Sequence, residues 1–110
     1  EEARSNWSRM IRKALARGIK VILLTPTPDL KEDIRDPETL LARHAQMVRS
    51  LAETYHVGLV DSYSIFRQMA LDGVDLKHYM SQNNHPNEKG HRVVADAILE
   101  WFLDADNYEK

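Results

Sequence analysis

The chain has 110 residues, of which 43% are hydrophobic and 29% charged, which is an ordinary globular composition and leaves room for one domain. Its formal net charge of −2 gives no strong field that would attract nucleic acid or an anionic membrane, and no apolar run approaches the roughly 18 residues of a membrane span. The lack of cysteine excludes disulfides, thiolate metal sites and cysteine nucleophiles.

The start of the chain predicts a helix followed by a buried strand. Apolar residues recur at helical spacing from Trp7 to Leu15, and Gly18 is placed to end that helix. Residues 21–24 are continuously apolar, which is typical of a strand buried on both faces. Pro26 and Pro28 end this strand, because proline cannot donate to a sheet ladder.

The middle of the chain predicts a second helix and a second strand. Asp36 is a candidate N-cap, with Pro37 at the first helical position. The apolar face of this helix is formed by Leu41, Ala45, Val48, Ala52 and Tyr55. Residues 56–61 then form a short strand that ends at Asp61. An aspartate there is a candidate site residue by position, although such a residue more often caps the following helix.

The last third of the chain predicts two more helices. The first covers residues 62–71 and stops at Gly73. The second begins near Glu88 with Asn87 as its N-cap. Gly90 in its first turn costs about 1 kcal/mol relative to alanine, so we expect close packing at that position. Trp101 and Phe102 are expected to belong to the core rather than to a binding platform.

The order of elements predicts an α/β fold. Strands that alternate with helices form a parallel sheet with helices over both faces. Two strands are too few for such a sheet, since three are usually a minimum. We therefore expect the second half of a larger α/β domain, with the two strands parallel neighbours and one face or edge of the sheet uncovered. The alternative is a small α/β domain that pairs with a copy of itself or with another chain.

The densest run of polar residues is SQNNHPNEKGH at positions 81–91, just before the final helix. Open parallel sheets carry their sites at the carboxyl ends of the strands, and His85 lies in a loop that could face that edge. Pro86 biases His85 toward an extended backbone, and a histidine pKa near 6.5 suits general acid–base chemistry. A solvated His85 in a helix-capping loop is an equally weighted interpretation of the spacing alone.

A metal site formed by His78, His85 and His91 is a weaker interpretation of the same region. Their spacing matches no standard zinc pattern, and no acidic or thiolate ligand stands beside them. His91 is expected on the face of the last helix, near the same edge of the sheet. His44 and His56 are expected to be structural.

The segment HPNEKGH resembles the last block of the SGNH hydrolases, also called GDSL-type esterases and lipases. The matching positions are His85, Pro86, Asn87, Gly90 and His91. ARGIKVILLTPTP and LAETYHVGLVDSYSIF are similar to the family's penultimate strand with its loop and to its last helix–strand passage. The resemblance implies a flavodoxin-like three-layer α/β/α fold with parallel strands. Residues 1–110 would be the C-terminal portion of a single domain of this kind, with its N-terminal half missing.

The resemblance also implies a serine esterase in which His85 is the general base for the nucleophile, with no metal or organic cofactor. The family's Gly-Asp-Ser segment and its oxyanion-hole Gly and Asn have no counterpart here, so we assign no serine as nucleophile and expect this chain alone to be inactive. Gln82 stands where the family has an aspartate three residues before the histidine. We therefore expect a neutral oxygen, from Gln82 or from the main chain of residues 80–83, to accept a hydrogen bond from Nδ1 of His85.

The polar loop TPTPDLKEDIRD at positions 25–36 favours small or carbohydrate-linked acyl esters over long lipids as substrates. The expected partners are this small-molecule ester and the missing N-terminal half or a partner chain, with no nucleic acid and no membrane span. A function of another class is the alternative, namely a non-catalytic α/β interaction module that retains the scaffold without the chemistry.

Overall fold

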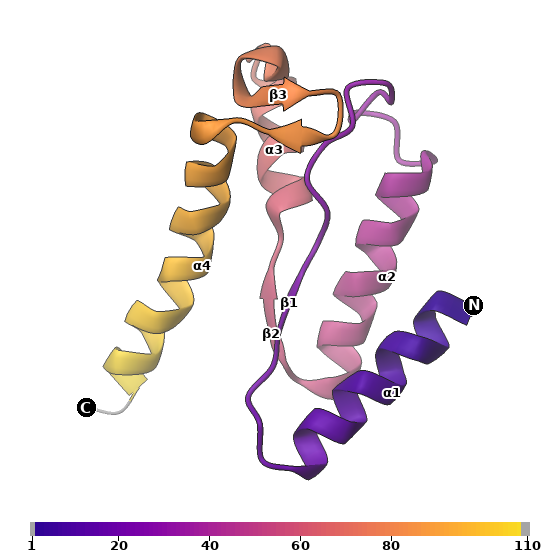
Figure 1. Cartoon of the computed structure of the whole chain (residues 1–110), viewed down its shortest axis with the longest axis vertical. Coiled ribbons are helices and arrows are strands. Elements are labelled where there is room, and N and C mark those ends of the chain that lie inside the picture. Colours follow the sequence, from indigo (N-terminus) through magenta and orange to yellow (C-terminus); the bar gives the residue numbers. More distant parts are fainter. Residues whose placement is uncertain (1, 109–110) are drawn as a thin grey trace.

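The computed structural model describes the backbone of residues 2–108 and the side chains of residues 2–103. The elements in chain order are α1 (Glu2–Ala16), β1 (Ile22–Leu24), α2 (Leu40–Tyr55), β2 (Gly58–Val60), α3 (Ser62–Leu71), the 3-10 helix η1 (Leu76–Tyr79), β3 (Met80–Gln82), β4 (His85–Pro86) and α4 (Glu88–Tyr108). This order confirms the predicted alternation of helices and strands and adds η1 and the β3–β4 hairpin before the last helix (Figure 1).

The strands β1 and β2 are parallel neighbours, as predicted (Figure 1). Ile22 lies opposite Gly58, and Leu24 lies opposite Val60. The ladder continues beyond the strand ends, because the Thr25 amide donates to the Val60 carbonyl at 3.0 Å. Together with the flanking helices, this pair makes the fold a mixed α/β arrangement.

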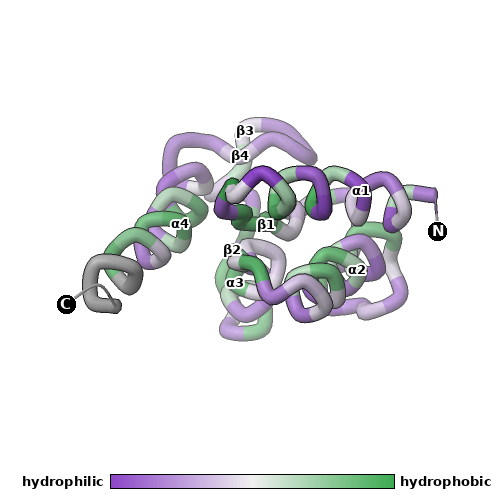
Figure 2. The backbone as a smooth tube through the Cα atoms, turned by 90° about the horizontal axis from the view of Figure 1, so that it is seen from below, coloured by the Kyte–Doolittle hydropathy of each residue, from purple (hydrophilic) through white to green (hydrophobic). Residues whose placement is uncertain are grey.

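One face of the strand pair is covered by α1 and α2 (Figure 2). The core on this side contains Ile11, Leu23, Val48, Leu51 and Ala52. Trp7 and Tyr55 pack against it as half-buried side chains. The apolar stripes predicted for the first two helices therefore meet on one side of the sheet. Gly18, with φ of +73°, follows α1 in the left-handed conformation expected of a helix stop.

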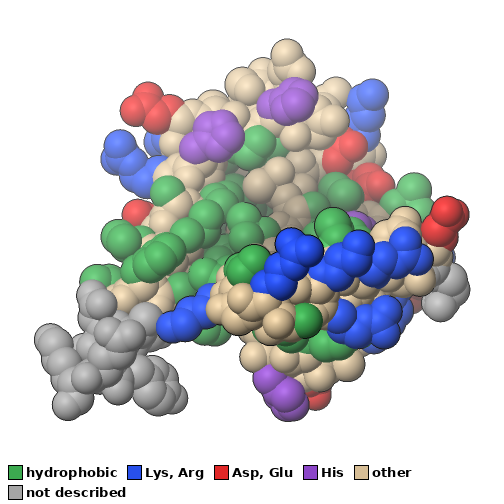
Figure 3. Space-filling view, turned by 60° about the horizontal axis from the view of Figure 1, so that its bottom comes forward, with side chains coloured by type: hydrophobic (Ala, Val, Ile, Leu, Met, Phe, Trp, Pro, Cys, Tyr) green, Lys and Arg blue, Asp and Glu red, His purple; other side chains and the backbone are tan. Residues whose placement is uncertain are grey.

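The opposite face is covered only in part, because α4 packs over β2 and leaves β1 open (Figure 2). Leu24 is 41% exposed, Trp101 40% and Phe102 58%. Apolar side chains gather in this region between α4 and α1 (Figure 3). The expected uncovered face is thus confirmed. The predictions that residues 21–24 are buried on both faces and that Trp101 and Phe102 belong to the core are wrong within the described residues, because no described helix lies over β1 on this side.

The two outer edges of the strand pair differ. Gly58 and Val60 direct their backbone groups toward β1, so Leu59 faces outward. Its carbonyl accepts a hydrogen bond from Nε1 of Trp101 at 2.7 Å, which closes the β2 edge. On β1 the alternation turns Ile22 and Leu24 outward, and among residues 2–108 no hydrogen bond to their backbone groups is recorded on that side. The open edge is therefore that of β1.

The start of the second helix differs from the prediction. α2 begins at Leu40, and Thr39 is its N-cap, with Oγ1 accepting from the Ala42 amide at 3.2 Å. Asp36 instead accepts from the Glu38 amide at 2.9 Å. An aspartate that bonds the backbone two residues ahead closes a turn, so Asp36 and Pro37 lie before the helix rather than at its first turn.

The second core lies above the strands, between α2, α3 and α4. Its buried members are Ile34, Ala45, Tyr63, Phe66 and Leu76. Gly73 adopts a φ of +92° after α3, as expected of a helix stop.

No described helix, including α4, has the length and apolar character to cross a membrane.

Candidate functional site

The β3–β4 hairpin brings the two predicted site residues together. Gln82 lies opposite His85 in the antiparallel register, and Asn83 and Asn84 form the turn between them. The Ser81 hydroxyl donates to the His85 carbonyl at 3.1 Å, which braces the two strands near the turn. Both candidate side chains are exposed. The hairpin therefore presents the imidazole and the amide to solvent from adjacent positions.

A main-chain hydrogen bond ties this hairpin to the loop that follows β1. The Leu30 amide, in the loop that follows β1, donates to the Asn83 carbonyl at 2.8 Å. The hairpin and this loop lie at the end of the molecule toward which β1 and β2 run (Figure 1). His85 is thus located on the side of the strands' carboxyl ends, where sites of open parallel sheets are found.

Asn87 holds the base of the hairpin with its side chain and its main chain. Its Oδ1 accepts from the Gly90 amide at 3.1 Å, which confirms it as the N-cap of α4. Its Nδ2 donates to the His78 carbonyl at 2.8 Å, and its amide donates to the Tyr79 carbonyl at 3.0 Å. One side chain therefore fixes the last helix and η1 to each other, two residues after His85.

Gly90 confirms the expected close packing in the first turn of α4. A Cβ at this position would collide with the Tyr79 carbonyl oxygen and lie 2.8 Å from Cβ of Pro86. Real Cβ atoms do not approach other heavy atoms so closely. The close neighbours are the main chain of η1 and the proline that follows His85, so glycine allows α4 to start directly against the hairpin.

The hydrogen bond expected at Nδ1 of His85 is not observed, since no bond to either ring nitrogen is recorded among the described side chains. The Asn83 carbonyl, one of the expected acceptors, is used by the Leu30 amide. The aspartates near in sequence are also engaged elsewhere, because Asp72 accepts from Gln68 and Asp75 caps η1. In this structure the imidazole is exposed and has no protein partner within the described part of the chain.

Asp61 is the centre of a polar cluster at the carboxyl end of β2. Its carboxylate accepts from Nε of Arg49 at 2.6 Å, from the Thr25 hydroxyl at 2.9 Å and from the Ser64 amide at 3.2 Å. Partial burial acts to raise the pKa of Asp61, but the hydrogen bonds from Arg49, Ser64 and Thr25 together hold it below its ordinary value. Asp61 therefore caps α3, as the commoner interpretation predicted.

Thr25 and Arg49 were not expected from the sequence as partners of this cluster. The Thr25 hydroxyl is buried and also accepts from the Tyr63 amide at 3.0 Å, so it joins the end of β1 to the start of α3. The only sequence signal is its position between an apolar strand and a proline. Residues 2–103 bring no three His, Asp or Glu side chains close enough to hold a metal ion.

The structure is a mixed α/β fold with a parallel strand pair, and it is similar to the fold of an esterase of known structure. It is similar to the crystal structure of an acetyl xylan esterase, AlAXEase, with a TM-score of 0.74 and 23% sequence identity over 88% of this chain and 52% of that one. The chain thus spans about half the length of this structure. No match is found among curated proteins.

The chain belongs to the GDSL-like lipase/acylhydrolase family, whose family model matches residues 1–93. This match confirms the resemblance drawn from the HPNEKGH segment and the two passages before it. The matched range includes the hairpin and the first turn of α4, and therefore both His85 and Gln82.

Proposed function

We propose that residues 1–110 are the C-terminal portion of a single SGNH-type esterase domain, in which His85 is the general base. The observation that carries this proposal is the place of His85 on a braced hairpin at the carboxyl side of β1 and β2. Membership of a lipase/acylhydrolase family supports the reaction class, and the esterase fold of the solved structure supports the architecture.

In the proposed reaction, a serine from the preceding part of the domain attacks the ester carbonyl. The neutral imidazole of His85 takes the serine proton and returns it to the leaving alcohol, after which water hydrolyses the acyl-enzyme by the same route. The exposed ring, free of protein hydrogen bonds within the described residues, is accessible for this transfer. Gln82, opposite in the hairpin, is proposed to orient the ring through a neutral oxygen when the site is complete.

The preceding part of the domain is proposed to complete the sheet at β1. The β2 edge is closed by Trp101, whereas the outward backbone groups of Ile22 and Leu24 are free to pair with a further strand. The partly covered apolar face beside that edge would be buried by the helices of the same segment. This chain spans 52% of the solved esterase, which is consistent with a domain about twice its length.

The proposed substrates are small acyl esters or carbohydrate-linked esters. The loop between β1 and α2, which lies beside the hairpin, is rich in charged side chains that suit a polar ligand better than a long acyl chain. The solved structure of similar fold is described as an acetyl xylan esterase, and its name refers to acetyl esters of a carbohydrate.

The test compares His85→Ala with His91→Ala in the complete protein, using p-nitrophenyl acetate as the ester. Loss of a general base lowers kcat by roughly 10²–10⁴-fold, so we expect that loss for His85→Ala. His91 is exposed on the first turn of α4 and should cost far less. Equal losses in two folded variants would replace the assignment with a paired role for the histidines, and unchanged turnover by His85→Ala would refute it.

A second candidate is the non-catalytic α/β interaction module. It is favoured by one observation, the lack of a carboxylate partner for His85 among the described residues, where the family has an aspartate. Turnover of short esters by the complete protein would exclude this candidate.

The isolated 110-residue chain is proposed to give only background hydrolysis, and robust turnover by the pure chain would overturn the proposed division of the domain.

A further inference from the structure

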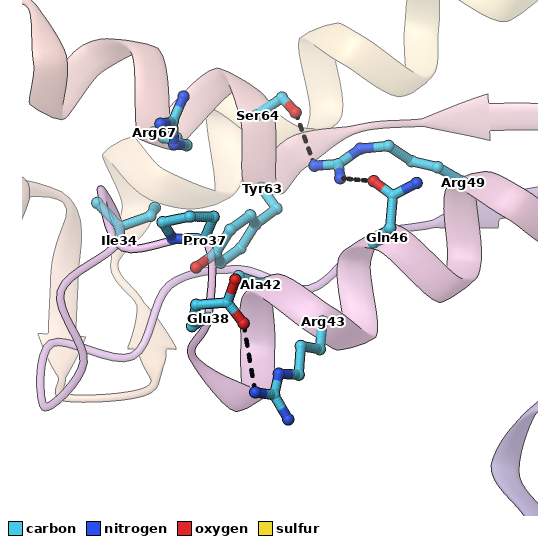
Figure 4. A pocket seen from close by; sticks show the side chains of 10 residues that line it. All are labelled: Ile34, Pro37, Glu38, Ala42, Arg43, Gln46, Arg49, Tyr63, Ser64 and Arg67. Atoms are coloured by element: carbon cyan, nitrogen blue, oxygen red, sulfur yellow. Dashed lines mark hydrogen bonds and ion pairs between the residues drawn. The ribbon is translucent and has the colours of Figure 1, made fainter. Parts of the chain in front are cut away.

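A pocket of about 590 Å³ lies between α2, the start of α3 and the loop before α2 (Figure 4). It shares no lining residue with the β3–β4 hairpin. Its apolar wall consists of Ile34, Pro37, Ala42 and the ring of Tyr63. Three arginines, Arg43, Arg49 and Arg67, also line it, against a single acidic residue, Glu38. Its volume is in the range of small-molecule sites.

The three arginines differ in how far their charge is neutralised. Arg49 is paired with Asp61 at 2.6 Å and is committed to the cap of α3. Arg43 is paired with Glu38 at 3.3 Å, but both side chains are largely exposed, so this pair is weak. Arg67 has no carboxylate within ion-pair distance among the described residues, and its guanidinium donates only to the Arg35 carbonyl at 3.5 Å. The pocket therefore carries about one unit of uncompensated positive charge, located at Arg67.

The hydroxyl of Tyr63 adds a second donor with no recorded partner in the described part of the chain. The residue as a whole is only 2% exposed, but its hydroxyl is not among the buried polar atoms without a partner, so the oxygen is open to solvent. Figure 4 shows this hydroxyl on the side of the ring nearest Pro37 and Glu38, within the lining of the pocket. An apolar wall, a guanidinium without a carboxylate partner in the described part of the chain and an accessible hydroxyl thus line one cavity.

We propose that this pocket binds a small organic monocarboxylate. The planar guanidinium of Arg67 matches a carboxylate in two parallel hydrogen bonds, and Arg43 is available as a further donor. The side chains of Pro37 and Ala42, which are accessible in the lining, take the apolar body of the ligand. One excess positive charge fits a monoanion, whereas a phosphate dianion would bring a second negative charge into a cavity that already contains Glu38. The site is separate from His85 and goes beyond the proposed hydrolysis.

The test uses benzoate and benzamide, which share a shape and differ in charge, titrated into the full-length protein and followed by calorimetry and NMR. We expect saturable benzoate binding with benzamide about tenfold or more weaker, since a charged hydrogen bond contributes more than a neutral one. Arg67→Gln should reduce benzoate affinity about tenfold and leave benzamide unchanged, whereas Arg17→Gln, the same charge change on an exposed residue after α1, should leave both unchanged.

Equal affinity for benzoate and benzamide, equal effects of the two arginine substitutions, or no saturable binding of benzoate would each overturn the proposal. Tighter binding of inorganic phosphate than of benzoate would also overturn it, because the class of ligand would then be wrong. Circular dichroism of both variants separates loss of binding from loss of fold. Arg67→Lys provides a second variant, which keeps the charge without the planar fork and is expected to restore only part of the affinity.

Discussion

The indole of Trp101 in α4 donates to the main-chain carbonyl of Leu59 in β2 over 2.7 Å. Leu59 is the β2 residue that faces away from β1, so this bond occupies a position where a further strand would pair. The ring also lies 3.5 Å from the position of a Cβ at Gly58, which is ordinary van der Waals contact, so the indole packs against the start of β2. A single side chain therefore ends the sheet on one side and leaves β1 as the edge open to a partner strand.

Trp101→Phe tests that bond while retaining an aromatic ring. The variant leaves the Leu59 carbonyl without its donor, and we expect the free energy of unfolding to fall by about 1 kcal/mol. Urea denaturation of the complete protein measures the change. Glu100→Gln is the control, because Glu100 is an exposed polar residue in the same helix and should change stability by less than about 0.5 kcal/mol. An unchanged midpoint for Trp101→Phe would mean that the bond does not hold α4 to the strand.

Gly90→Ala tests the contact between α4 and η1. In an ordinary helix position this change stabilises by about 1 kcal/mol, but here the new methyl group meets the Tyr79 carbonyl and Pro86. We expect destabilisation of about 1–3 kcal/mol instead, together with displaced NMR signals from His85 as the hairpin moves. Arg92→Ala, an exposed change in the same helix, is the control. A stabilised Gly90→Ala variant would contradict the packing described here.

The lowered pKa of Asp61 predicts how the stability of the fold depends on pH. The pKa of its carboxyl is held below its ordinary value of 3.8 in the folded state, so its contribution is fully present above that value and is lost as the pH falls through the lowered folded-state pKa. Asp61→Asn should therefore lower stability near neutral pH and reduce the loss of stability on acidification. Urea midpoints measured from about pH 6 downward show both effects.

Asp33→Asn is the control for this experiment. The pKa of Asp33 is also lowered, mainly by the hydrogen bond from the Arg35 side chain, but the pair lies on the exposed surface. Exposed ion pairs contribute little, so this substitution should leave the acid dependence of stability nearly unchanged. If the two substitutions altered the pH profile equally, the Thr25–Asp61–Arg49 cluster would have no special part in stability.

Gln82→Asp tests the partner of His85 and rests on the proposed esterase function. A carboxylate opposite His85 in the hairpin would stabilise the imidazolium formed during the reaction, so we expect kcat of the complete protein to rise roughly tenfold. The apparent pKa of the base in the pH–rate profile should rise as well. Asn84→Asp, which adds the same charge in the turn, is the control. A lower kcat for Gln82→Asp, or an equal gain for Asn84→Asp, would exclude position 82 as the orienting residue.

Features that depend on near neighbours in the chain were determined by the sequence itself. The spacing of apolar residues predicted the helices and the two strands, and residues such as Gly18 and Asn87 marked helix ends through their own backbone and capping preferences. The segment around His85 and the passages before it were sufficient to identify the family. The order of strands and helices was sufficient to predict a parallel pair with an uncovered face, because a βαβ connection leaves few alternatives.

Features that depend on competition between distant groups were decided only by the tertiary structure. Asp36 and Thr39 are both residue types that cap helices well. Only the structure shows that Thr39 caps α2, because the Asp36 carboxylate bonds the Glu38 amide and closes a turn before the helix. By sequence alone the Asn83 carbonyl was an equally good acceptor for His85. In the structure it accepts from the Leu30 amide, which is far away in sequence. Main-chain bonds of this kind have no side-chain signature. The exposure of Leu24 and Trp101 likewise depends on which elements cover a face, a property of the assembled fold rather than of any local pattern.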